Sequence, residues 1–309
     1  MHDLQTVTAY APATCGNVIV GFDILGLAIS NVGDKVTLTR RQDSALVITH
    51  ISGIDSLPTD PKQNIASAVI AQLLADLNLN WGFDIELHKG IPLSSGLGGS
   101  AASAAAALMA LNQFLPTPLS LTQLAHYAML GEALCSGQAH PDNIVPALYG
   151  GITLITEQNP IQVVSLPIPD IVCVLVHPHL ELTTRKARSI LAASVPLHAH
   201  CVQSAYLAGF ISALYQKDLN LIAQSLRDVI IEPQREQLVP GFSAVKKAAL
   251  AKGALGASLS GSGPTVLAFA RDAMQAEQVG LAMQAAFAKC GITSNIYLSP
   301  ISQQGAYVM

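Results

Sequence analysis

The chain has 309 residues, of which 50% are hydrophobic and 12% charged, so it can bury a large core and is long enough for two domains. Its net charge is −4 and no run of lysine or arginine exceeds two residues, which excludes a basic surface for nucleic acid. The longest uninterrupted apolar run, 104–111, is too short to cross a bilayer, so we expect no membrane partner.

Five cysteines are scattered along the chain without close pairs, at Cys15, Cys135, Cys173, Cys201 and Cys290. An odd, dispersed set is typical of reduced thiols rather than of a disulfide framework or a zinc site. We therefore expect a cytoplasmic protein whose ligand is a small molecule. The sequence leaves open whether the chain acts as a monomer or as a homodimer.

In the first half, strands are expected to alternate with helices. Alternating apolar and polar positions broken by glycine and proline predict strand, loop and strand within the first thirty residues. Asp60-Pro61 predicts the start of a helix that reaches Leu77, because aspartate is a good cap and proline fits the first helical position. A strand is expected at 83–88, and a buried alanine-rich helix at about 100–115.

The capping-box pair Ser120 and Gln123 predicts a further helix that runs to about Cys135. Strands are expected at 152–156 and 171–177, and prolines between them suggest a domain boundary near residue 165. The remaining elements are expected to be helices at about 184–192, 200–216, 218–230 and 242–252, and strands at 265–270 and 294–299. We thus expect two domains, 1–165 and 166–309, with a cleft between them.

The strongest functional signal is a glycine-rich loop directly before the alanine-rich helix. Its backbone N–H groups and the positive end of the helix dipole can converge on an anion such as phosphate. It is not a Walker loop, because no lysine follows the glycines, and no lysine or arginine occurs between Lys89 and Arg185. Amides, hydroxyls and a metal ion must therefore meet the negative charge, unless the loop is only a flexible turn. The loop comprises Pro92, Leu93, Ser94, Ser95, Gly96, Leu97, Gly98, Gly99, Ser100, Ala101, Ala102 and Ser103.

Glu132 is notable because it falls in the predicted buried stripe of the 120–135 helix, between apolar residues such as Leu124 and Ala128. A buried carboxylate needs a partner, since leaving it alone costs several kcal/mol. A metal ion is one candidate. The alternative is an ion pair with a distant arginine or lysine from the second half.

The glycine-rich loop resembles the nucleotide-binding motif of the GHMP kinases, the superfamily of galactokinase, homoserine kinase, mevalonate kinase and phosphomevalonate kinase. Three further stretches resemble its homoserine kinase branch, in the order of that family and over nearly the whole chain. They are APATCGN with GFDILG (11–26), HPDN (140–143), and EPQR and PGF (232–242) together with SGSGPT (260–265). The chain departs from many relatives at Ile19-Val20 and Ala139, where they have Gly-Pro and Gly; this bears on substrate geometry more than on the fold.

The resemblance implies an α+β protein whose N-terminal, ATP-binding domain is like domain 2 of ribosomal protein S5 and whose C-terminal domain is ferredoxin-like. It implies that ATP, with Mg²⁺ held by Ser100 and Glu132, phosphorylates L-homoserine to O-phospho-L-homoserine on the route to threonine. Asn64 and Lys89 are further candidates for contact with the nucleotide. Two alternatives remain at this stage: another kinase of the superfamily, and a non-catalytic nucleotide sensor.

The resemblance also implies the residues of an amino-acid pocket. Asp23 suits the ammonium group of homoserine, and a guanidinium suits its carboxylate. Asp142 is the fallback candidate for a general base, although the resemblance implies that alignment and charge stabilisation do most of the work. For any single arginine a solvated role is the alternative, and for His140 alone a core role. The implied substrate-binding residues are Asn17, Asp23, His140, Asn143, Arg188 and Arg235, with Arg185 as a further candidate, and the implied catalytic residues are Asn143, Asp142 and Arg235.

Overall fold

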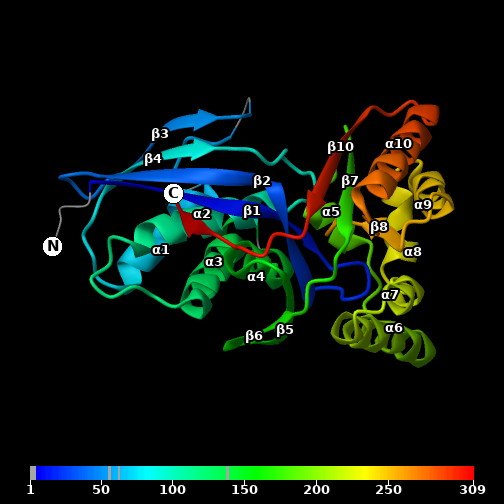
Figure 1. The fold of residues 1–309 in the computed structure, drawn as a ribbon. Coiled ribbons are helices and arrows are strands. Elements are labelled where there is room, and N and C mark those ends of the chain that lie inside the picture. The colour runs from blue at the N-terminus through cyan, green and yellow to red at the C-terminus, as the bar shows by residue number, and fades with distance from the viewer. Residues whose placement is uncertain (1–4, 55–56, 62, 137–138) are drawn as a thin grey trace.

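The computed structural model describes residues 5–54, 57–61, 63–136 and 139–309 (Figure 1). Its first sheet has seven strands, mostly antiparallel, in the order β11-β1-β2-β4-β3, with β5 paired to β2 and β6 to β5. Only β3 and β4 run parallel within it. The strands are β1 (Thr6–Gly16), β2 (Leu25–Arg40), β3 (Leu46–Ser52), β4 (Phe83–His88), β5 (Ile152–Gln158), β6 (Ile161–Leu166) and β11 (Tyr307–Val308).

Four helices cover one side of the long strands β1 and β2 (Figure 1). The most central is α2, whose many alanines let it pack closely against both strands, so that eleven of its fourteen residues are buried. The Thr14 N–H donates to the carbonyl of Leu97, so the end of β1 lies beside the loop that precedes α2. The four helices are α1 (Ile65–Asp76), α2 (Gly99–Asn112), α3 (Leu121–Ser136) and α4 (Pro141–Tyr149).

The second sheet is antiparallel, with the order β10-β7-β9-β8. Helices α9 and α10 pack against it and against each other around a second apolar core (Figure 1). Its strands are β7 (Val172–Pro178), β8 (Gly256–Leu259), β9 (Val266–Ala270) and β10 (Ser294–Pro300). The remaining elements are α5 (Thr184–Ser189), α6 (Leu197–Gln216), α7 (Leu219–Ser225), α8 (Glu232–Arg235), η1 (Glu236–Leu238), α9 (Phe242–Ala251) and α10 (Ala273–Lys289).

The chain passes from the first sheet to the second between Leu166 and Val172. The last residues of the chain lie on the first sheet again, because Ile301 forms a bridge with Ile29 and β11 pairs with β1. A division into 1–165 and 166–309 stays a prediction about domains, and the end of the chain packs on the first sheet. No helix among the described residues is both long and apolar enough to span a membrane.

Two predicted helix limits are wrong, each because a local cap decides them. The first helix begins at Ile65 and not at Pro61, because the side chain of Asn64 accepts the backbone N–H of Ala66. The helix predicted at 218–230 ends at Ser225, because Leu226 leaves the helical region and Asp228 accepts the backbone N–H groups that follow it.

The capping box of α3 is confirmed: Ser120 Oγ accepts the Gln123 N–H, and Gln123 Oε1 accepts the Ser120 N–H. Sequence patterns missed α4, whose interior holds Pro146, as well as α10, β3, β6, the second half of β2 and the short strand β8.

Candidate active site

A cavity of about 950 Å³ lies where the two halves of the chain meet. The first half contributes the glycine-rich loop, the loop after β1 and the start of α4, and the second half contributes α5, Arg235 and the turn at Gly261. Predicted site residues that line it are Asn17, Asp23, Asn64, Lys89, Pro92, Leu93, Ser94, Ser95, Gly96, Gly98, Gly99, Ser100, Ala101, Glu132, His140, Asp142, Asn143, Arg185, Arg188 and Arg235. The structure therefore gathers almost all of the predicted site.

Three predicted nucleotide contacts do not line the cavity. Leu97 and Ala102 are fully buried, and the Ala102 N–H is already bonded to the carbonyl of Gly98 within the helix. Ser103 is also buried, with its hydroxyl bonded to Asp34. These three side chains are therefore part of the buried interior that supports the loop.

The start of α2, where the loop is expected to bind phosphate, lines the cavity. Gly98 takes the N-cap position at φ 66°, where no side chain caps the helix. The first N–H groups of a helix have no partner within it, so those of Gly99, Ser100 and Ala101 are available to the cavity that these residues line. A Cβ on Gly98 would lie 1.9 Å from Thr14 Oγ1, so only glycine fits here.

The second glycine loop braces the first. The Ser260 hydroxyl donates to the carbonyl of Gly96 at 2.7 Å, and the Thr265 N–H donates to the carbonyl of Ser95 at 3.2 Å. A Cβ on Gly96 would lie 2.6 Å from the carbonyl oxygens of Ser260 and Gly263, so the two loops touch backbone to backbone. The two halves of the chain thus meet directly behind the predicted phosphate site.

Lys89 reaches the cavity edge, but its ammonium is committed to a buried network that sequence reasoning missed. It donates to Asp34, to Ser103 Oγ at 2.8 Å and to the carbonyl of Gly99 at 3.0 Å. Asp34 also accepts the backbone N–H groups of Gly90 and Ile91. Little in the sequence pointed to this network, because β2 carries other polar residues beside Asp34, such as Asn31 and Lys35. The network fixes the end of β4 that leads into the glycine-rich loop.

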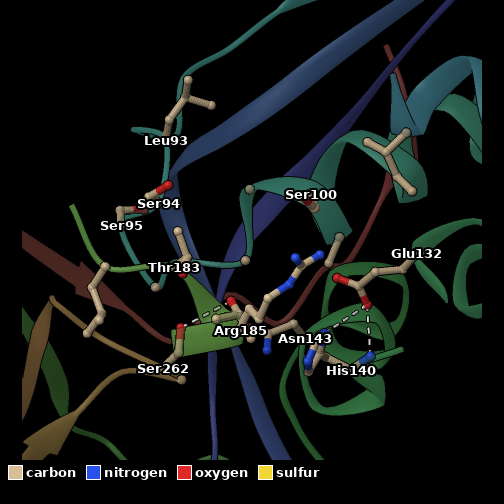
Figure 2. Close-up of a pocket in the computed structure, with 18 of the residues that line it drawn as sticks. Leu93, Ser94, Ser95, Ser100, Glu132, His140, Asn143, Thr183, Arg185 and Ser262 are labelled. Atoms are coloured by element: carbon tan, nitrogen blue, oxygen red, sulfur yellow. Dashed lines mark hydrogen bonds and ion pairs between the residues drawn. The ribbon is translucent and has the colours of Figure 1, made fainter. Parts of the chain in front are cut away.

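Glu132 is 8% exposed and points from α3 toward the start of α4 (Figure 2). Its Oε2 accepts the backbone N–H of His140 at 2.8 Å and lies 3.4 Å from His140 Nδ1. Ser100 lines the same cavity from the first turn of α2. Among the described residues no cluster of three or more His, Cys, Asp or Glu side chains is arranged to hold a metal ion. A metal ion here would therefore use a carboxylate, a hydroxyl and oxygens of its ligand.

The other end of the cavity holds a chain of polar contacts from Glu132 to Asp23. Arg188 Nε donates to His140 Nε2 at 3.1 Å, so the proton of neutral His140 sits on Nδ1, toward Glu132. Burial lowers the pKa of His140, but the hydrogen bond and charge of Glu132 outweigh it, and the pKa is raised. The Arg188 guanidinium then binds both carboxylate oxygens of Asp23.

Asp142, which lines the same cavity, is only 2% exposed. Its carboxylate accepts the backbone N–H of Asn17 at 3.1 Å and the amide of Asn143 at 3.3 Å. Burial, followed by the charge of Asp23, raises the pKa of Asp142 to about 7. A carboxyl group with such a pKa can accept or release a proton near neutrality.

The loop that carries Asp23 is held in an unusual backbone conformation. Asn17, Val18 and Ile19 have φ values of 70°, 45° and 66°, and Asp23 has φ 62°. Such values are outliers for β-branched residues, and strain of this kind clusters at functional sites. The side chain of Asn17 holds the loop, because its Oδ1 accepts the Asp23 N–H and its Nδ2 donates to the carbonyl of Gly261.

Arg235 is 3% exposed and comes from α8, far from the loop in sequence. Its Nε donates to the carbonyl of Ala187 and its Nη1 to the carbonyl of Gly261, both at 3.1 Å. Burial, and then the charge of Arg188, lowers the pKa of Arg235. The cavity thus receives both Arg188 and Arg235 from the second half of the chain.

Known proteins resemble this chain in family models, in sequence and in fold. The GHMP kinases N terminal domain matches residues 64–151, and the GHMP kinases C terminal domain matches residues 210–289. A homoserine kinase of Chlorobium phaeobacteroides strain BS1 is 44% identical over 99% of this chain and 100% of its own length. The crystal structure of homoserine kinase from Cytophaga hutchinsonii, 41% identical, superposes with a TM-score of 0.95 over 100% of this chain and 99% of that one. A mevalonate kinase from Methanococcus jannaschii, 16% identical, shares the fold with a TM-score of 0.70, covering 97% of this chain and 99% of that one.

Proposed function

We propose that the cavity of this chain binds ATP at one end and L-homoserine at the other. The chain belongs to the homoserine kinases within the GHMP kinases. The reaction moves the γ-phosphoryl group of ATP to the hydroxyl of L-homoserine and gives O-phospho-L-homoserine, on the route to threonine. One observation carries the proposal: the uncapped start of α2 opens into the same cavity as Asp23, Arg188 and Arg235. The cavity therefore offers amides to phosphates and both charges to an amino acid.

The amino acid would bind where Asp23 and Arg188 now pair. Its ammonium matches the carboxylate of Asp23, and its carboxylate matches the guanidinium groups of Arg188 and Arg235. The two ends of the zwitterion would replace the mutual bonds of Asp23 and Arg188, so no charge is left unpaired. Such a pocket would select against mevalonate, which has a carboxylate but no ammonium group, and against galactose, which has neither charge.

ATP would bind with its phosphates at the first turn of α2. The residues fit Mg²⁺, because the carboxylate of Glu132 and the hydroxyl of Ser100 are the hard oxygen ligands that it prefers. When bound, the ion would offset charge on the β- and γ-phosphates. The chain itself would orient the hydroxyl of homoserine in line with the phosphorus. Such positioning, together with electrostatic stabilisation, accounts for most of the catalysis in phosphoryl transfer.

Asp142 and Asn143 would act on the attacking hydroxyl in different ways. Asp142 has a pKa of about 7 and could accept it, while Asn143, whose Oδ1 accepts the hydroxyl of Thr14, would orient the substrate. We also propose that the enzyme works in the cytoplasm, because Cys15, Cys173, Cys201 and Cys290 are free thiols in the described chain.

A coupled assay of ADP release tests the function with L-homoserine, L-serine, mevalonate and galactose, each with and without Mg²⁺. We expect turnover with L-homoserine above all, with O-phospho-L-homoserine identified by mass spectrometry. Preferred phosphorylation of mevalonate or galactose would assign another reaction of the superfamily. ATP binding without turnover on any substrate would favour the nucleotide sensor. Size-exclusion chromatography of the same sample would distinguish a monomer from a homodimer.

A further inference from the structure

Phe22 contacts both arginines at the amino-acid end of the cavity. The guanidinium carbon of Arg188 lies 5.5 Å from the centroid of its ring, and that of Arg235 lies 5.1 Å from it. Both distances fall within the range of about 6 Å in which a cation is attracted to an aromatic face. In the described chain Phe22 is not itself part of the cavity lining, so it would act on a substrate through the arginines.

The two arginines need such a partner because they carry like charges in a partly desolvated place. Arg188 is neutralised by Asp23, but the hydrogen bonds of Arg235 go to the uncharged carbonyls of Ala187 and Gly261. The charge of Arg188 is felt at Arg235, where it opposes the protonated form. An aromatic face carries partial negative charge, and it can therefore hold two guanidinium groups near each other without neutralising either one.

The position of the ring is fixed by the loop that carries it. Phe22 precedes Asp23, whose backbone N–H is bonded to Asn17 Oδ1. One turn thus presents an acid to Arg188 and an aromatic ring to both arginines. A carboxylate in place of Phe22 would cancel the charge that a substrate must find, whereas an aliphatic side chain would leave the guanidinium groups without this attraction.

We propose that Phe22 is a positioning residue, which holds Arg188 and Arg235 oriented toward the carboxylate of the substrate and so raises the affinity for substrates that carry one. The inference rests on the proposed function of the cavity. It concerns the recognition of one group, the carboxylate, and leaves ATP binding unaffected.

The test compares Phe22→Leu, which removes the aromatic face, with Phe22→Tyr, which keeps it. We expect Phe22→Leu to raise the KM for L-homoserine about 2- to 30-fold, the equivalent of about 0.5–2 kcal/mol of cation–π attraction. The KM for ATP should stay within about twofold, and Phe22→Tyr should behave as wild type. The KM for 3-amino-1-propanol, which lacks the carboxylate, should not change in any variant.

A second measurement separates ring electrostatics from packing. Replacing Phe22 by 3,4,5-trifluorophenylalanine keeps the shape of the ring but weakens its negative face. We expect a raised KM for L-homoserine with an unchanged melting temperature. An unchanged KM in this variant, or an equal rise for 3-amino-1-propanol, would overturn the proposal. A wild-type enzyme that does not phosphorylate L-homoserine would instead overturn the proposed function.

Discussion

Arg188 binds Asp23 through two guanidinium nitrogens, with N–O distances of 2.9 Å and 2.6 Å. The pair is partly exposed to the cavity, the side chain of Arg188 by 22% and that of Asp23 by 31%. Each member of the pair neutralises the other, and their charges complement the two ends of an amino acid. In the proposed binding mode, a substrate zwitterion would exchange this set of charge-assisted bonds for another and would bury no additional net charge.

The first prediction concerns Arg235 as a reader of the substrate carboxylate. Arg235→Leu should lower kcat/KM for L-homoserine by about one and a half to nearly four decades, for a loss of about 2–5 kcal/mol at ~1.4 kcal/mol per decade. The KM for ATP should move little, and Arg235→Lys should rescue only partly because it lacks the fork of a guanidinium. Steady-state kinetics with L-homoserine and 3-amino-1-propanol measure the effect. A Leu variant that still prefers L-homoserine as strongly as wild type would assign the carboxylate to Arg188 or Arg185.

The second prediction tests Glu132 as a ligand of Mg²⁺. Glu132→Gln keeps an oxygen that can accept the backbone N–H of His140 but removes the charge, so turnover should fall by orders of magnitude. Thermal shift gives a readout independent of turnover: stabilisation by Mg²⁺ with ATP should shrink, while stabilisation by L-homoserine remains. Wild-type activity together with a lower melting temperature would show that Glu132 serves only to anchor His140.

The third prediction follows from the raised pKa of Asp142. Its folded-state pKa of about 7 exceeds the usual value of 3.8, so the folded protein holds this proton more tightly than the unfolded chain does. That contribution to stability is fully present below the unfolded pKa and is lost as the pH rises toward 7. Asp142→Asn should therefore gain stability relative to wild type as the pH rises from about 4 to about 7. Urea unfolding at several pH values measures the difference, and parallel curves would contradict the assignment.

The fourth prediction separates the buried network of Lys89 from nucleotide binding. Lys89→Met leaves the carboxylate of Asp34 without its cation and should destabilise the protein by about 3–5 kcal/mol. The double variant Asp34→Asn with Lys89→Met should recover part of that loss in chemical unfolding. If Lys89 also touches ATP, as the sequence suggests, the double variant will keep a raised KM for ATP. A KM equal to that of wild type would limit Lys89 to supporting the loop.

The fifth prediction compares neighbouring glycines of the loop. A Cβ on Gly98 would meet Thr14 Oγ1 at 1.9 Å in a backbone conformation that disfavours side chains, so Gly98→Ala should lower the melting temperature as well as ATP affinity. The nearest atom to a Cβ on Gly99 is Ile91 Cγ2 at 3.3 Å, so Gly99→Ala should fold nearly as well as wild type. Equal melting temperatures for the two variants would argue against this loop conformation.

Local sequence determined those parts of the protein whose stabilising contacts are close along the chain. The capping box at Ser120 and Gln123, the alanine-rich helix α2 and the glycine loop before it depend on neighbours within a few residues. The burial of Glu132 could be predicted for the same reason, because helical periodicity alone decides which face it shares. The order of the motifs along the chain, which resembles that of a known family, indicated the family and predicted the residues of the pocket.

Only the tertiary structure decided how those residues are connected. Arg188 meets Asp23 across 165 positions of sequence, and Lys89 meets Asp34 across 55, through the register of strands and the packing of two sheets. The pairing of Glu132 with His140, and the contact of Phe22 with two arginines, likewise depend on the meeting of separate elements. Periodicity reports which face of an element is buried, but it does not report what that face meets. The sequence shows that no lysine or arginine follows Lys89 before Arg185. The fold brings Arg188 and Arg235 from the second half of the chain into the cavity that this segment lines.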